Sequence, residues 1–397
     1  MAEGHTRPAW AEVDLSAVRH NVGVLRACAA PAAVCAVVKA GAYGHGAVPV
    51  ARAALEGGAA GLAVALVDEG VELREAGIGA PVLVLSEPPD TAAEVVVTAG
   101  LTPTVATPGT VRALGAAARR AGTRLAVHMK VDTGMHRVGV APEAAAALAA
   151  AVAEEPALHL EGVFTHLAVA DGTGPEERAF TEAQLERFDA AVAGLGARPQ
   201  VLHAANTAGA VAWPAARYDM VRCGIGIYGL APSPVLVDGS GRVAEVLAQL
   251  RPALSLRARV SAVRELGPGS RPSYGRLRPL PGRAVVATVP LGYADGVPRA
   301  LFGAGCTVLV GGRRRPLAGM VTMDQIVVDC GPDAAVAVGD EVVLIGDQGG
   351  EAIAVCEWAR MLGTVDYEVV CGIGARVARR YVGQRNLRPA ARTGRRG

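Results

Sequence analysis

The chain contains just two lysines, Lys39 and Lys130, although lysine and arginine together number 39. This bias indicates that arginine serves wherever positive charge alone is needed. Guanidinium stays protonated and is a poor nucleophile, whereas an amine whose pKa is lowered by burial can form a Schiff base. Lys39 closes an apolar run that starts at Val34, and glycines and Tyr43 follow at once. We therefore expect amine chemistry at Lys39, the alternative being an ordinary surface lysine.

Polar side chains also close several other apolar runs. They are Lys130 with Asp132 and Thr133, His166, His203 with Asn206 and Thr207, and Arg222. In a parallel α/β barrel the catalytic groups lie at the C-terminal ends of the strands. A single histidine such as His166 is more often a satisfied core residue. Because polar residues recur at the ends of successive apolar runs, we expect these residues to lie together at one mouth of a barrel.

Closely spaced glycines follow Arg222 in the segment Cys223-Gly224-Ile225-Gly226. Their backbone amides could hold an anion, and barrel enzymes commonly bind phosphate after the final strands. Glycine turns are common, so the segment alone is a weak signal. Combined with a Schiff-base lysine, it predicts a cofactor that has both an aldehyde and a phosphate. Pyridoxal 5′-phosphate has both.

Apolar runs alternate with alanine-rich helical stretches over residues 34–230. Expected strands cover 34–39, 61–66, 81–86, 101–105, 125–131, 160–166, 199–203 and 218–222. Helical patterns between them include 45–57, 107–121, 142–154 and 176–193. About eight strand–helix units in roughly 200 residues predict an α/β fold with an N-terminal (β/α)8 TIM-type barrel. A doubly wound sheet is the alternative, because one sequence does not reveal strand order.

The pattern changes after about residue 235. Short β-branched runs at 256–265, 284–290, 306–311, 325–329 and 341–345 are separated by glycine- and proline-rich turns. They predict a mostly-β C-terminal domain. We expect the barrel in residues 1–240, with 8–15 as a strand that could join the β domain. The β domain would cover 241–384, and 385–397 would form a disordered basic tail.

Composition and charge exclude several classes of protein. The chain is 51% hydrophobic and 19% charged, as expected for a globular protein with an ample core. A net charge of +2 gives no reason to expect nucleic acid or a membrane surface as partner. The first residues resemble no signal peptide, so we expect a cytoplasmic location. Seven scattered cysteines predict buried reduced thiols, with neither disulfides nor a metal site.

A set of motifs, taken together and in order, resembles the alanine racemase family, pyridoxal-phosphate enzymes of fold type III. The motifs are AVVKAGAYGHG (36–46), HMKVDTGMHRVG (128–139), THLAVAD (165–171), HAANTAG (203–209), VRCGIGIYGL (221–230), SYG (273–275), GYADGVPR (292–299), MDQ (323–325) and DYEV (366–369). The resemblance runs from about Pro8 to Tyr381. It implies a barrel plus a β domain, a head-to-tail homodimer with shared active sites, and interconversion of L- and D-alanine for peptidoglycan precursors.

The resemblance also implies roles for the matching residues. Lys39 would hold the cofactor and act as the base toward D-alanine, and Tyr274 of the partner subunit would be the base toward L-alanine. The resemblance further implies that the cofactor is bound by Tyr43, His166, Asn206, Thr207, Arg222, Gly224, Ile225 and Tyr367. Substrate binding would fall to Arg137, Met323 and Asp324, with Arg137 held by a carbamylated Lys130. The channel for the substrate would be shaped by Tyr293, Arg299 and Asp171.

Arg222 restrains the expected chemistry. Arginine keeps its proton, so a pyridine nitrogen paired with it stays unprotonated and the ring is a weaker electron sink. That disfavours transamination. Three residues depart from the common family pattern: Gly41 replaces a frequent Asn or Asp, Thr207 a frequent Ser, and Thr322 a frequent Cys. None of these departures removes a catalytic group.

Three other functions stay open from sequence alone. A racemase for another small amino acid, such as serine, would use the same groups. An amino-acid decarboxylase on the same architecture would generally pair the pyridine nitrogen with a carboxylate, and Arg222 argues against it. A cofactor-carrying barrel protein of vitamin B6 handling would lack the long β domain and the Tyr274 motif.

Overall fold

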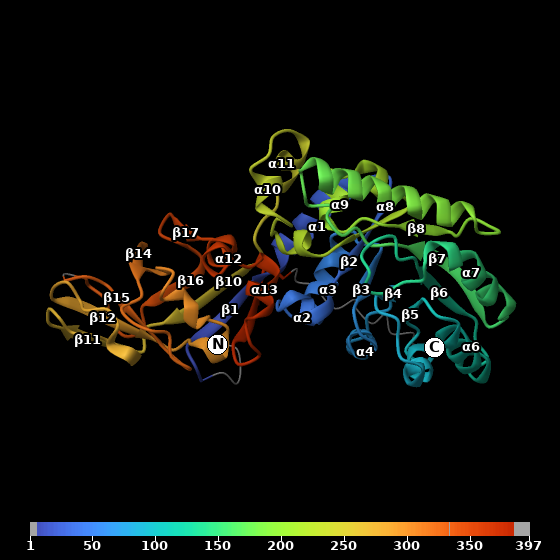
Figure 1. The fold of residues 1–397 in the computed structure, drawn as a ribbon. Helices are drawn as coiled ribbons and strands as arrows, with labels where there is room; N and C mark the ends of the chain where they lie inside the picture. The colour runs from blue at the N-terminus through green and yellow to red at the C-terminus, as the bar shows by residue number, and fades with distance from the viewer. Residues whose placement is uncertain (1–5, 333, 385–397) are drawn as a thin grey trace, which may run out of the picture.

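The computed structural model describes residues 6–332 and 334–384, and in them a barrel and a mostly β domain lie side by side (Figure 1). The barrel strands are β2 (Ala33–Val37), β3 (Gly61–Val64), β4 (Val82–Val84), β5 (Thr102–Val105), β6 (Leu125–Lys130), β7 (Leu158–Phe164), β8 (Val201–His203) and β9 (Met220–Cys223). They pair in parallel in the order β8-β7-β6-β5-β4-β3-β2-β9. The Asp219 amide donates to the Leu202 carbonyl at 3.0 Å, which nearly closes the ring between β8 and β9. The predicted barrel is confirmed, and the doubly wound alternative is wrong.

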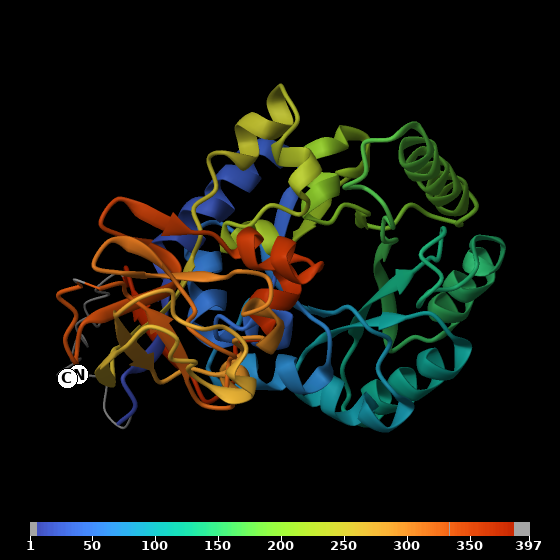
Figure 2. The same ribbon diagram turned by 60° about the vertical axis from the view of Figure 1, so that its left-hand side comes forward.

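Helices surround these strands (Figure 2). They are α1 (Leu15–Ala29), α3 (Ala47–Glu56), α4 (Val67–Glu75), α5 (Ala93–Thr98), α6 (Pro108–Arg120), α7 (Ala145–Glu154), α8 (Pro175–Ala193) and α9 (Thr207–Ala212), and the shorter α10 (Pro234–Val237) and α11 (Arg242–Leu247) follow β9. Capping side chains determine where two of these helices begin. The Asp14 carboxylate accepts from the amides of Ser16 and Ala17 ahead of α1. Thr107 caps α6, and Pro108 occupies its first turn.

The β domain consists of two sheets. The larger has the order β14-β13-β16-β10-β1-β18, with β17 paired to β16, and the smaller has the order β11-β12-β15. Their strands are β1 (Ala9–Asp14), β10 (Leu254–Arg259), β11 (Ala262–Leu266), β12 (Ala284–Val289), β13 (Thr307–Val310), β14 (Arg313–Pro316), β15 (Ile326–Asp329), β16 (Glu341–Gln348), β17 (Glu351–Ile353) and β18 (Ala378–Val382). β1 pairs antiparallel with β10 and parallel with β18. The chain therefore passes through this sheet before it enters the barrel.

The predicted mostly-β C-terminal domain is confirmed, but its two short helices, α12 (Val355–Leu362) and α13 (Asp366–Cys371), were not predicted. Both helices are too short for their periodicity to stand out in the sequence. Trp358 is buried on the inner face of α12, and the Glu357 carboxylate caps the amide of Ala354 at 2.9 Å. α13 lies beside the barrel in Figure 1. It thereby brings residues from late in the sequence to the barrel mouth.

The domain bounds predicted above stay a prediction, and the predicted tail 385–397 lies outside the described residues. Within the described ranges, no helix combines the length and the apolar character that crossing a bilayer requires.

Candidate active site

A cavity of about 520 Å³ opens at the C-terminal ends of the barrel strands. Residues after β2, β6, β7, β8 and β9 contribute to its wall, as does α13. The structure brings together here the predicted residues Lys39, Tyr43, Lys130, Arg137, His166, Asn206, Thr207, Arg222, Gly224, Ile225 and Tyr367. The volume suits a cofactor of the size of pyridoxal phosphate together with a small substrate.

Lys39 is presented by the turn expected after its strand, but the left-handed backbone of this turn was not predicted. Ala40, Gly41 and Ala42 have φ values of 53°, 59° and 53°, and Tyr43 follows at 52°. Left-handed conformations cost non-glycine residues roughly 1–2 kcal/mol each, so neighbouring contacts must stabilise this turn. Glu69 supplies one of them, because its carboxylate accepts from the amide of Ala40 and also from that of Ala65.

Lys39 is half-buried, and its pKa is lowered first by burial and then by the charge of Arg137. Both effects favour the neutral amine. A neutral amine is the form that can attack an aldehyde. The surroundings of Lys39 therefore suit Schiff-base chemistry.

The loops after β8 and β9, together with Tyr43, offer donors to an anion. Thr207 Oγ1 accepts from the amides of Gly224 at 3.1 Å and Gly226 at 3.4 Å, which leaves its own proton free to donate outward. Burial raises the pKa of Tyr43 and of Tyr367, so both phenols keep their protons. Their ring centroids are 6.0 Å apart. These groups fit a phosphate.

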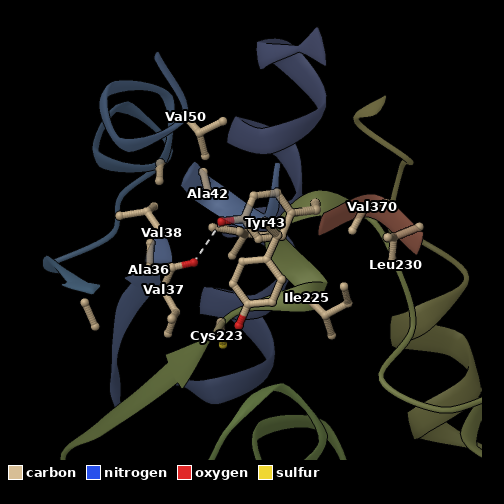
Figure 3. Close-up of a cluster of buried hydrophobic side chains, with 14 of the residues drawn as sticks. Ala36, Val37, Val38, Ala42, Tyr43, Val50, Cys223, Ile225, Leu230 and Val370 are labelled. Atoms are coloured by element: carbon tan, nitrogen blue, oxygen red, sulfur yellow. Dashed lines mark hydrogen bonds between the residues drawn. The ribbon is translucent and has the colours of Figure 1, made fainter. Parts of the chain in front are cut away.

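Tyr43 is held in place by apolar neighbours. Figure 3 shows it among Val37, Val38, Ile225 and Val370, all members of the buried core. Gly44 permits the approach of α13, because a Cβ at residue 44 would lie 2.4 Å from the carbonyl oxygen of Val370. The phenol is thus positioned by the barrel on one side and by the β domain on the other.

Arg222 is buried at the end of β9 and donates to four acceptors. They are the carbonyls of Thr165 (2.8 Å) and Ala204 (2.9 Å), Nδ1 of His203 (2.8 Å) and Nδ1 of His166 (3.2 Å). Burial lowers the pKa of Arg222 to about 10, so the guanidinium remains charged at neutral pH. Burial and then the charge of Arg222 lower the pKa of His166 well below its ordinary value, which keeps that imidazole neutral. A fixed cationic donor therefore faces the cavity.

Lys130 and Arg137 place two positive groups close together. Burial and then the charge of Arg137 lower the pKa of Lys130 to about 8. The loop that carries Arg137 is shaped by Asp132, whose carboxylate accepts from the amides of Gly134 and His136 at 3.0 Å each. Two adjacent cations at a cavity wall favour an anion between them, either a modified lysine or a carboxylate ligand.

Six predicted site residues do not line this cavity among the residues described: Asp171, Tyr274, Tyr293, Arg299, Met323 and Asp324. Tyr274 is 73% exposed, in a short 3₁₀ helix (Tyr274–Arg276) that joins β11 to β12. These two strands lie at the end of the β domain remote from the barrel (Figure 1). A single chain therefore does not bring Tyr274 to Lys39.

Two of these exposed segments are joined to each other. The amide of Tyr293 donates to Thr322 O, and that of Ala294 to Met323 O, each at 3.0 Å. Asp324 pairs with Arg376 at 2.7 Å. The Tyr293 and Met323 segments consequently form one surface of the β domain.

Sequence reasoning missed several residues of the cavity. Phe164 lies under two cations, 5.1 Å from the Arg222 guanidinium and 5.6 Å from Lys130 Nζ. Its position at the end of a predicted strand, just before His166, was an available signal. Cys371 also lines the cavity but belongs to α13, which was not predicted. His203 was noted as a strand-end residue without a role.

Comparisons with known proteins agree over nearly the whole chain. The family model described as alanine racemase, N-terminal domain, matches residues 13–232, and that of the C-terminal domain matches residues 253–381. An alanine racemase of Symbiobacterium thermophilum is 48% identical over 381 residues, covering 95% of this chain and 98% of that protein. One of Desulfovibrio desulfuricans is 43% identical over 383 residues, covering 95% and 98%. The crystal structure of alanine racemase from D-cycloserine-producing Streptomyces lavendulae has a TM-score of 0.88 at 39% identity, covering 96% of this chain and 98% of that one.

Proposed function

This chain belongs to the alanine racemase family of pyridoxal-phosphate-dependent isomerases, and from that premise we propose that it interconverts L- and D-alanine by a two-base mechanism in a homodimer. One observation carries the proposal: Lys39, with its lowered pKa, lines the same cavity as the donors of Tyr43 and Thr207 and the cation of Arg222. This set matches the aldehyde, phosphate and ring nitrogen of the cofactor.

Pyridoxal phosphate, when bound, supplies a conjugated ring that withdraws electrons from the substrate Cα and so eases loss of its proton. The phosphate would be held by Tyr43, Asn206, Thr207, Tyr367 and the Gly224–Ile225 backbone. Arg222 would donate to the pyridine nitrogen and keep it unprotonated, because arginine retains its own proton. That arrangement limits electron withdrawal and favours returning the proton to Cα.

The two bases stand on different domains. Lys39 would remove or return the Cα proton on one face, and Tyr274 of the partner subunit would do so on the other. The exposed position of Tyr274 supports this role, because a phenol at the end of the β domain is free to enter the cavity of a second copy. Met323 and Tyr293 are exposed apolar side chains on the same domain, as expected where a second copy docks. Met323 and Asp324 would then complete the substrate pocket, and Tyr293, Arg299 and Asp171 its channel.

Arg137 would bind the substrate carboxylate. We further propose that Lys130 is carbamylated. Its neutral nitrogen would attack carbon dioxide, form an N–C bond and release one proton, leaving an anion beside Arg137. The pKa of about 8 supports this, because the neutral amine is available near physiological pH. The enzyme would work in the cytoplasm, and its D-alanine would supply the precursors of peptidoglycan.

The experiment that tests the proposal combines trapping with a chiral assay. Borohydride should abolish the visible absorption of the holoenzyme and attach the pyridoxyl group to the peptide that contains Lys39. Lys39→Arg should show no attachment, whereas the matched variant Lys130→Arg should retain it. Either alanine enantiomer should yield both. Faster turnover of serine would contradict the substrate, and release of carbon dioxide from an amino acid would contradict the reaction class.

A further inference from the structure

A continuous line of buried side chains runs from Arg222 into the barrel. Arg222 contacts Nδ1 of His203 at 2.8 Å, and Nε2 of His203 contacts Nδ1 of His128 at 2.8 Å. Nε2 of His128 contacts the Glu161 carboxylate at 3.2 Å. The side chain of Glu161 is 34% exposed, whereas that of His128 is 5% exposed. The line therefore joins a buried cation at the cavity to a carboxylate that reaches solvent.

The two ends of this line determine where its protons lie. Arginine can only donate, so Nδ1 of His203 must accept and its proton must be on Nε2. That proton is donated to Nδ1 of His128, which therefore carries its own proton on Nε2. An ionised carboxylate can only accept, so the His128 proton points to Glu161. The hydrogen bond from His128 lowers the pKa of Glu161, which keeps the carboxylate ionised at neutral pH. Both histidines are then neutral and share one tautomer.

The fold is locally adapted to build this line. In the pairing of β6 with β7, Val127 lies opposite Leu160 but His128 lies opposite Gly162, so Glu161 is an extra residue in a bulge. Bulges redirect side chains and are frequent next to active sites. A Cβ at Gly162 would lie 2.5–2.8 Å from atoms of the His128 ring. The absence of a side chain at residue 162 thus makes room for the imidazole.

Phe164 holds the imidazole ring of His203, the member of the line next to Arg222. Its ring stacks on His203 with a centroid separation of 4.7 Å and an angle of 7°. His203 is thereby fixed between Phe164, Arg222 and His128. Each member has little freedom to rotate without breaking a buried hydrogen bond.

We propose that Glu161 and His128 are positioning residues for racemisation, which act through His203 to orient Arg222 and to offset its charge. The inference rests on the proposed function of Arg222 at the pyridine nitrogen. Linked hydrogen bonds in a low-dielectric interior polarise one another, so the charge of Glu161 influences Arg222 across the two imidazoles. Glu161 and His128 line no part of the cavity, among the residues described, and act without contacting substrate or cofactor.

The first test observes the protons directly. Holoenzyme labelled with ¹⁵N-histidine is studied by long-range ¹H–¹⁵N correlation, and the variants His128→Gln and His203→Gln assign the signals. Both residues should appear as Nε2–H tautomers. Glu161→Gln keeps an acceptor oxygen but removes the charge, so it should shift the Nε2–H resonance of His128 and, to a smaller extent, that of His203. A proton on Nδ1 of either ring, or an unmoved His203 signal, overturns the proposal.

The second test measures the consequence for catalysis. Glu161→Gln should lower kcat for alanine by about threefold to tenfold, the range expected for altering one buried hydrogen-bond line, with KM changed by less than about twofold. Gly162→Ala should do the same by displacing His128. The matched control is Glu94→Gln, which removes a surface carboxylate that pairs with Arg120 at 2.9 Å and should leave kcat unchanged.

The outcomes separate the two proposals. Wild-type kcat in Glu161→Gln overturns the positioning role even if the tautomers are as stated. An equal rise of KM and fall of kcat would indicate general damage to the site and likewise overturn it. If the wild-type holoenzyme racemises no alanine, the proposed function fails, and the tautomers still report whether the line exists.

Discussion

The hydroxyl oxygen of Tyr43 lies 2.4 Å from the position that a Cβ atom on Gly224 would occupy. The phenol can reach the loop after β9 because residue 224 has no side chain. Two segments that are far apart in the sequence therefore form one wall of the cavity, and the close approach determines where the phenol can donate.

Gly224→Ala should weaken binding of pyridoxal phosphate. The added methyl group would push Tyr43 away from the anion site, and the loss of one hydrogen bond to a charged group corresponds to a roughly tenfold or greater rise in Kd. Absorbance titration of the cofactor-free protein measures this. Gly23→Ala is the control, because a Cβ at residue 23 in α1 meets nothing within 4 Å. Equal cofactor affinity in the two variants would contradict the steric explanation.

Gly41 departs from the family pattern, and its backbone gives the reason. Its φ is 59° and a Cβ there meets nothing within 4 Å, so any cost of substitution is conformational. Gly41→Asn should change the free energy of unfolding by less than about 1 kcal/mol, because asparagine tolerates this region. Gly41→Val should lower it by roughly 1–2 kcal/mol. Urea unfolding of both variants measures the difference, and a valine variant as stable as the asparagine variant would refute this account.

Tyr274→Phe should reduce kcat by about 10²–10⁴, the usual contribution of a general acid–base group. Cofactor binding and the melting temperature should stay unchanged, because the substitution removes only a hydroxyl group and the phenol packs little against its own subunit, where it is 73% exposed. Normal racemisation by this variant would show that the phenol is not a base.

Mixing two inactive variants tests whether the site is shared. Random assembly of Lys39→Arg and Tyr274→Phe subunits gives half heterodimers, each with one intact site, so about a quarter of wild-type activity should return. Activity that does not recover on mixing, in a sample shown to exchange subunits, would place both bases in one chain.

Lys130 should carry a carbamate whose occupancy depends on pH. Carbon dioxide reacts with the neutral amine, and a pKa of about 8 leaves about a tenth of the amine neutral at pH 7, far more than for an unperturbed lysine. With ¹³C-bicarbonate at a fixed carbon dioxide pressure, a carbamate signal should appear and grow from pH 6 to 8. Lys130→Arg should lack the signal and show a higher KM for alanine. An identical spectrum for the wild type and this variant would contradict carbamylation.

Much of the architecture could be read from local patterns. The alternation of apolar runs with helical stretches predicted the barrel, because each strand and helix is specified largely by its own residues. The strand-end positions of Lys39, Lys130, His166 and Arg222 predicted a common mouth, since parallel strands direct their C-terminal ends to the same side. Lysine scarcity and the glycines after Arg222 indicate the cofactor independently of the family resemblance.

Tertiary structure alone decided what depends on contacts between distant segments. The left-handed turn at residues 40–43 is supported by Glu69 from α4, and α13 reaches the barrel mouth although its six residues carry too weak a periodicity to predict. The exposure of Tyr274 and the line from Arg222 to Glu161 likewise follow from packing and from a one-residue bulge. Sequence specifies which groups are available because residue chemistry and strand periodicity are local properties. The mutual orientation of these groups is determined only in the folded chain, because close packing between distant segments and buried hydrogen bonds allow few arrangements of the side chains.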